Sequence, residues 1–193
     1  MAEKKKKGRR SYLADYVQDV NGQYVYTGSH YLAQTDGASM PRLLRGIFGL
    51  LLLAMLALIG VGCLSTGTAS GAFYVTLPHV AAIVLGALCL YDCGVVLQGK
   101  GCLRSHVYER SVPRLRGSTA AGAICAGIAA VGQTVYTFVA GKAATRGADI
   151  LFFVGCYLAF ALFFLAFRTQ KRIVWEKELG KSGKALDNDR ENG

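Results

Sequence analysis

Proline is scarce in this sequence, and charged side chains are almost missing from its longest apolar runs. Only 3 of the 193 residues are proline, whereas 52% are hydrophobic. The apolar residues gather in four blocks, each close to the roughly 20 residues that cross the hydrocarbon of a bilayer. Every backbone N–H and C=O inside that hydrocarbon must be paired within its own segment, so each block should form a helix. We therefore expect transmembrane helices at about 43–64, 73–97, 119–140 and 150–167.

The alternative fold is a soluble helical bundle with a very apolar core. Each helix of such a bundle would need a polar stripe that faces water. The fourth block, which reads ILFFVGCYLAFALFFLAF, has no such stripe. The predicted fold is thus an all-α membrane protein, whose four transmembrane helices form two helical hairpins and leave no large soluble domain.

Basic residues decide the expected orientation. Lysine and arginine are dense before the first block, between the second and third blocks and after the fourth, whereas the other two connections carry few. Because such residues are retained on the cytosolic side, we expect both termini in the cytosol and the protein in the plasma membrane. Residues 1–38 would be a cytosolic segment, residues 39–167 the bundle, and residues 168–193 a cytosolic helical extension followed by a disordered tail.

Motifs of catalysis and cofactor binding are missing as well. The sequence offers no P-loop, dinucleotide fingerprint, zinc motif or Ser/His/Asp set, so we expect no enzyme, no cofactor and no metal. Five of the 6 cysteines lie within the apolar blocks, which argues against a disulfide framework. The basic residues 1–10 stand before a membrane span and indicate a topology determinant and an anchor for anionic headgroups rather than binding of nucleic acid.

A short β-hairpin is predicted before the first block. Asn21-Gly22 is a strong signal for a two-residue turn, and the arms on either side contain alternating tyrosine and valine. This turn would pair Gln18 with Val25 and Tyr16 with Thr27. An isolated two-stranded hairpin is marginal in water, so this one needs either the headgroup layer or a partner protein. The residues expected to dock there are the region's tyrosines and the tryptophan after the fourth block: Tyr16, Tyr24, Tyr26, Tyr31 and Trp175.

The third block is unusually rich in small residues and reads STAAGAICAGIAAVG from Ser118. Small faces let helices pack closely in lipid, where apolar burial drives little association. We therefore expect this helix to be central and to pack through Gly122, Gly127 and Gly132 against the other helices or a second subunit. Its large residues form a single stripe: Ile124, Ile128, Val131, Val135 and Phe138.

Two similar motifs stand before the first and third blocks, SMPRLLRG from Ser39 and SVPRLRG from Ser111. Two interpretations are open. Both helices could begin by the same local rules, with serine as a cap and proline in the first turn. Alternatively, a helical hairpin could have been duplicated to give two parallel halves.

Asp92 is the one acidic residue well inside a block. A carboxylate inside a membrane span is a candidate functional residue. Its expected partner is Arg45, which lies near the cytosolic end of the first block, on the same side of the membrane as Asp92. Three interpretations are open: an ion pair that only fixes helix packing, a proton or cation site, and recognition of a partner's charged residue. His79 follows Pro78, which can open the helix there, and is either hydrated or a ligand or pH-sensing group.

These observations favour a non-catalytic accessory or scaffold subunit of a membrane complex. Its expected partners are a bilayer with anionic headgroups and either another membrane protein or further copies of itself. The alternative is a small oligomeric transporter or channel that uses Asp92 as a proton or cation site.

Overall fold

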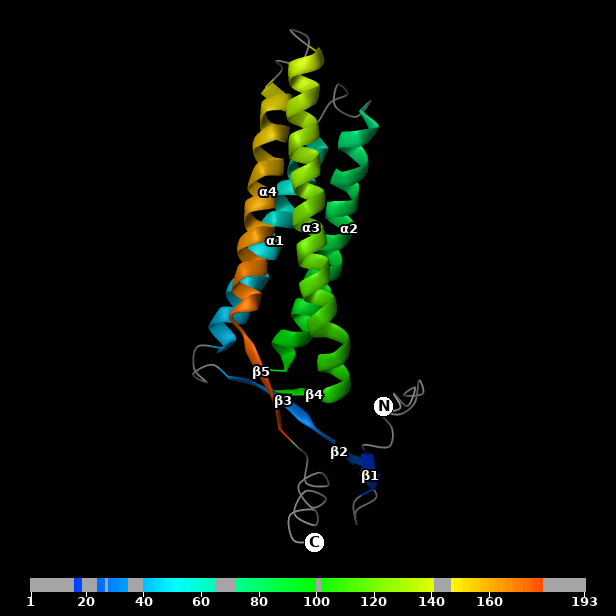
Figure 1. Cartoon of the computed structure of the whole chain (residues 1–193), viewed down its shortest axis with the longest axis vertical. Coiled ribbons are helices and arrows are strands. Elements are labelled where there is room, and N and C mark those ends of the chain that lie inside the picture. Colours follow the sequence, from blue (N-terminus) through cyan, green and yellow to red (C-terminus); the bar gives the residue numbers. More distant parts are fainter. Residues whose placement is uncertain are drawn as a thin grey trace, which may run out of the picture.

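The computed structural model describes residues 16–18, 24–26, 28–34, 40–64, 72–99, 102–140 and 147–178. Figure 1 shows a long bundle of four helices: α1 (Met40–Leu64), α2 (Phe73–Gln98), α3 (Ser105–Ala140) and α4 (Gly147–Lys171). All four are long and apolar enough to cross a membrane. The predicted all-α, four-span fold is therefore confirmed, and the chain is a multi-pass membrane protein by helix length and hydropathy.

The most extensive helix packing is between α2 and α3 and between α1 and α4. Helix α3 packs against both α2 and α4, and its bulky stripe is exposed on the outside of the bundle. An exposed row of isoleucine, valine and phenylalanine suits contact with lipid acyl chains. The bundle interior is instead lined by small residues and by a few large ones, of which Phe163 is the largest that is fully buried.

Two glycines allow α1 to approach its neighbours closely. A Cβ atom placed on Gly155 of α4 would lie 2.2 Å from Cγ1 of Val61 on α1. A Cβ atom on Gly86 of α2 would lie 2.3 Å from the sulfur of Met55 on α1. Neither glycine belongs to the small-residue stripe of the third block, so the sequence pattern did not single them out.

A three-stranded antiparallel sheet lies at one end of the bundle (Figure 1), which we call the sheet end; the opposite end is the far end. Its strands are β3 (His30–Gln34), β4 (Cys102–Arg104) and β5 (Val174–Glu178), in the order β4-β3-β5. They come from the segment before α1, the connection between α2 and α3, and the segment after α4. The sheet therefore joins three segments that are far apart in the sequence.

The strand β5 corrects the prediction of a helical extension after the fourth span. Helix α4 ends at Lys171, and the amides of Arg172 and Ile173 donate to the carbonyls of Thr169 and Gln170, each at 3.2 Å. The backbone of the following residues then pairs with β3 from Val174 to Glu178. A strand partner far away in the sequence supplies these hydrogen bonds, and no local pattern reveals it. The predicted disordered tail lies outside the described residues.

A two-stranded hairpin, β1 (Tyr16–Gln18) and β2 (Tyr24–Tyr26), is present as predicted, but its register differs. The structure pairs Tyr16 with Tyr26 and Gln18 with Tyr24. This is one residue away from the pairing that a two-residue Asn-Gly turn would give. A shift of one residue changes which residues face each other across the hairpin, so the predicted pairs Gln18–Val25 and Tyr16–Thr27 are wrong.

Helix α3 begins at Ser105, well before the predicted start of the third span. Pro113 therefore lies inside the helix, whereas Pro41 lies in the first turn of α1. An interior proline removes one helical hydrogen bond, and the neighbouring Ser111 and Val112 are buried. The first motif therefore lies at the start of a helix and the second lies inside one, so the interpretation that both helices begin at their motif is wrong for the second.

Candidate functional site

At the sheet end of the bundle, Asp92 on α2 forms an ion pair with Arg114 on α3. The Arg114 guanidinium binds side-on: Nε donates to Oδ2 of Asp92 at 2.7 Å, and Nη2 donates to Oδ1. The Asp92 side chain is 0% exposed, whereas that of Arg114 is 38% exposed. The guanidinium carbon also lies 5.9 Å from the centre of the Tyr91 ring. This two-point geometry fixes α2 relative to α3 and satisfies both carboxylate oxygens.

The partner of Asp92 is thus Arg114 rather than the expected Arg45. Arg45 is exposed on α1, and α2 packs more extensively on α3 than on α1. Arg114 stands outside the third apolar block, so the boundaries of the blocks do not indicate it as a partner. The earlier start of α3 turns this arginine into a helical residue within reach of Asp92. The partner of Asp92 therefore lies on α3, and the prediction of a partner on α1 is wrong.

A second group of buried polar side chains meets at Thr119, beside Cys89, which lies about one helical turn from Asp92 on α2. Thr119 of α3 donates its hydroxyl to the carbonyl of Leu115 at 2.6 Å. The same oxygen accepts a hydrogen bond from Nε2 of Gln170 on α4 at 3.0 Å and lies 3.4 Å from the sulfur of Cys89 on α2. Because the only hydroxyl proton goes to Leu115, the Cys89 thiol must be the donor in that last contact. One threonine therefore connects three helices.

Arg116 links this group to the start of the sheet. Its Nη2 donates to the backbone carbonyls of Ile173 at 3.0 Å and of Gln170 at 3.4 Å. The last carbonyls of a helix have no partner within the helix, and a cation there is favourable. Arg116 thus holds the end of α4 at the point where the chain turns into β5.

Aromatic stacking fixes the sheet against the bundle. The rings of Tyr31 on β3 and Tyr108 on α3 are stacked, with centroids 3.8 Å apart and planes 9° apart. Trp175 on β5 also lies against Tyr108, with centroids 5.6 Å apart and ring planes tilted by 60°. The register pairs Tyr31 with Leu103 and Ala33 with Trp175, so all four belong to the same face of the sheet. This face is directed toward the bundle, and Leu103 is buried.

The opposite face of the sheet, which we call the outer face, is exposed. It carries Leu32 and Val174, two exposed apolar residues whose positions are diagonal neighbours on adjacent strands. Charged residues surround them, including Glu176 opposite Leu32. The hairpin contacts this face, because Nη1 of Arg104 on β4 donates to the Tyr16 hydroxyl at 2.9 Å.

A small cavity lies between the helices and the sheet. It has a volume of about 20 Å³, enough for about one water molecule. Its lining is mostly apolar and includes two polar residues, Arg116 and Gln170. A cavity of this size at the sheet end cannot hold an organic substrate.

His79 and Gln133 are buried in the half of the bundle toward the far end. Nδ1 of His79 lies 3.8 Å from the sulfur of Cys156 on α4, and its ring packs against that of Phe152 with centroids 5.0 Å apart. Gln133 is fully buried, and neither of its amide atoms has a hydrogen-bond partner within the described part of the chain. His79 is therefore inside the bundle and not at a hydrated surface. Within the same described ranges, no three side chains of histidine, cysteine or acid gather as a metal site would need.

Apolar packing separates the two polar regions. Phe163 of α4 fills the middle of the bundle, where Gly86 of α2 and Gly122 of α3 lie against its ring together with Met55 of α1. The contacts described in this middle layer join glycine, methionine and phenylalanine. Gly86 stands between His79 and Asp92 on α2, so this apolar packing separates the two polar residues.

The structure brings some of the predicted site residues together and leaves others apart. Gly122 and Gly127 pack against phenylalanines of α4, and Gly132 packs against α2. Tyr31 and Trp175 meet at Tyr108, whereas Tyr24 is 73% exposed at the hairpin. The side chain of Tyr26 lies outside what the structure describes.

Sequence reasoning missed the residues that connect the elements. They are Arg104, Tyr108, Arg114, Arg116, Thr119 and Gln170. Of these residues, only the three arginines could have been singled out from the sequence, because they lie close together in the connection before the third block. Comparisons with protein-family models, curated proteins and solved structures found no match to this chain.

Proposed function

We propose that this protein is a non-catalytic subunit of a membrane complex and that it presents the outer face of its sheet, with the adjoining hairpin, to a partner protein. The observation that carries this proposal is the construction of the sheet. Three segments from distant parts of the chain converge on it, and one of its faces is held to the bundle by the Tyr31–Tyr108–Trp175 stack. The other face is left with exposed apolar residues.

Several features support docking at this face. Leu32 and Val174 are 39% and 57% exposed, and Tyr24 on the hairpin is more exposed still. Apolar and tyrosine side chains with a charged rim are typical of protein interfaces. The sheet is a rigid support, because Arg116 and the aromatic stack connect it directly to helices. By the distribution of basic residues this surface would face the cytosol.

Transport through a site at Asp92 draws less support. Both oxygens of Asp92 are occupied by Arg114, and the middle of the bundle is filled by Phe163. A carboxylate that already has a side-on guanidinium partner is a poor exchangeable cation site. These features favour the interpretation of Asp92 as a lock between α2 and α3.

The test is purification of the full chain from its native membrane in a mild detergent, followed by mass spectrometry of the proteins that accompany it. The docking variant carries Tyr24→Ala, Leu32→Ser and Val174→Ser, which change exposed side chains only. The matched control is Phe138→Ala, an 84% exposed residue near the far end. We expect the partner to be lost from the docking variant and retained by the control. Retention by both would overturn the proposal.

A second measurement separates this function from transport. The protein is reconstituted alone into liposomes, and uptake of protons and of monovalent cations is followed with fluorescent indicators. The proposal expects no flux above protein-free liposomes. A flux that Asp92→Asn abolishes would refute it and establish the alternative.

A further inference from the structure

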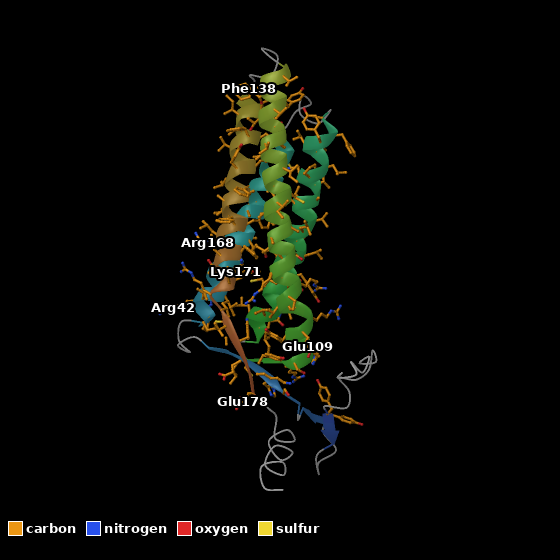
Figure 2. The ribbon with its side chains drawn as sticks, in the orientation of Figure 1. Arg42, Glu109, Phe138, Arg168, Lys171 and Glu178 are labelled. Atoms are coloured by element: carbon orange, nitrogen blue, oxygen red, sulfur yellow. The ribbon has the colours of Figure 1, made fainter. Side chains whose placement is uncertain are left out.

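The sheet end of the α1–α4 pair carries a group of exposed cations. Arg42 and Arg45 lie three residues apart on α1 and are both exposed. Arg168 and Lys171 are exposed in the last turn of α4. Figure 2 shows Arg42, Arg168 and Lys171 near one another at the same end of the bundle. Because α1 and α4 pack against each other, residues of two helices contribute to one positively charged surface.

No carboxylate of the described residues neutralises these cations. Over the described ranges, none of the four forms an ion pair with a carboxylate. Helix α1 contains no acidic residue, and the only one in α4 is Asp149 in its first turn, at the far end. Arg114 is different, since its charge is taken up by Asp92 on the other side of the bundle. The α1–α4 surface therefore has a local excess of positive charge.

Aromatic rings hold two of these cations at the edge of the apolar surface. The guanidinium carbon of Arg168 lies 5.9 Å from the ring centre of Phe164, and Nζ of Lys171 lies 4.5 Å from that of Phe167. Phe164 and Leu165 are exposed just beyond them, toward the far end. A cation that packs along an apolar surface with its charged end at the boundary is placed at the depth of lipid phosphates.

We propose that Arg42, Arg168 and Lys171 form a binding site for the phosphate of an anionic phospholipid, whose acyl chains lie along the exposed faces of α1 and α4. Charge complementarity selects an anion, and the apolar surface directly beside the cations selects one that carries hydrocarbon chains. The site is independent of the docking surface on the sheet, because it uses neither the outer face nor the hairpin.

The site is tested with the full chain in a neutral detergent, by titration with short-chain phosphatidylglycerol and native mass spectrometry of the complex. Dioctanoyl phosphatidylcholine serves as the zwitterionic comparison, and glycerol phosphate as the headgroup without acyl chains. We expect phosphatidylglycerol to bind in preference to both. Removal of one cation, as in Arg168→Gln, should weaken its apparent affinity roughly fivefold, and the combination Arg42→Gln, Arg168→Gln and Lys171→Gln should weaken it about a hundredfold.

The matched control is Arg110→Gln, which removes the same charge from an exposed position on α3. It should leave binding unchanged, and Arg168→Lys should restore most of the affinity that Arg168→Gln loses. An equal loss with Arg110→Gln would mean diffuse attraction to net charge and would overturn the site. Equal binding of phosphatidylcholine would overturn the electrostatic argument. Equal binding of glycerol phosphate would reassign the surface to a free phosphate.

Discussion

The close approach of α1 and α4 at Gly155 gives the sharpest test of the bundle. A Cβ atom added at this position would lie 2.2 Å from Cγ1 of Val61 and 3.2 Å from both its Cβ and its Cγ2. Valine has few side-chain rotamers in a helix and cannot turn away easily. The substitution Gly155→Ala must therefore separate the helices or shift their backbones.

The expected size follows from two opposing effects. Overpacking of a tight contact costs about 1–3 kcal/mol, whereas replacing glycine by alanine in a helix contributes about 1 kcal/mol of helix propensity. Gly60 provides the matched control, since nothing lies within 4 Å of a Cβ atom placed there. We expect Gly155→Ala to lower the melting temperature in detergent and Gly60→Ala to leave it unchanged or raise it.

A double-mutant cycle isolates the contact itself. Val61→Ala removes Cγ1 and Cγ2, including the nearest atom that the new Cβ would meet, so it should cancel most of the destabilisation caused by Gly155→Ala. Thermal unfolding of the purified protein is measured by heating samples to a series of temperatures and monitoring each of them by size-exclusion chromatography. If Gly155→Ala is as stable as Gly60→Ala, the packing of α1 on α4 described above is wrong.

Two further predictions concern the sheet end. Arg114→Gln should lower the melting temperature more than Asp92→Asn does, because Arg114→Gln leaves the buried Asp92 carboxylate unpaired, whereas in Asp92→Asn the half-exposed Arg114 can turn to water. The double variant Arg114→Gln, Asp92→Asn should melt at a higher temperature than Arg114→Gln alone. Additive losses of the two single substitutions would disprove a direct pair. Tyr108→Ala should release the sheet from the bundle and expose Trp175, which is the single tryptophan of the sequence. Its fluorescence emission should then shift to longer wavelength. An unchanged spectrum would show that the aromatic contacts of Tyr108 do not hold β5.

The candidate site could be predicted from the sequence only in part. Asp92 was recognised because a carboxylate inside an apolar block is conspicuous whatever its surroundings. Its partner was not, because the choice between Arg45 and Arg114 depends on which helices are neighbours and on where α3 begins. The same holds for Tyr31 and Trp175: each is a plausible interfacial aromatic by itself, but their common contact with Tyr108 exists only once the sheet has formed.

The sequence by itself determined the four spans. Hydrocarbon leaves the backbone no partner except its own helix, so the length and hydropathy of each apolar block were sufficient evidence. Only the tertiary structure decided that residues 174–178 form a strand and that the hairpin is shifted by one residue. Residues 174–178 pair with β3, a segment far away in the sequence, and such a partner leaves no trace in local composition. A shift of one residue keeps the same two arms of the hairpin paired, so their composition does not distinguish the two registers.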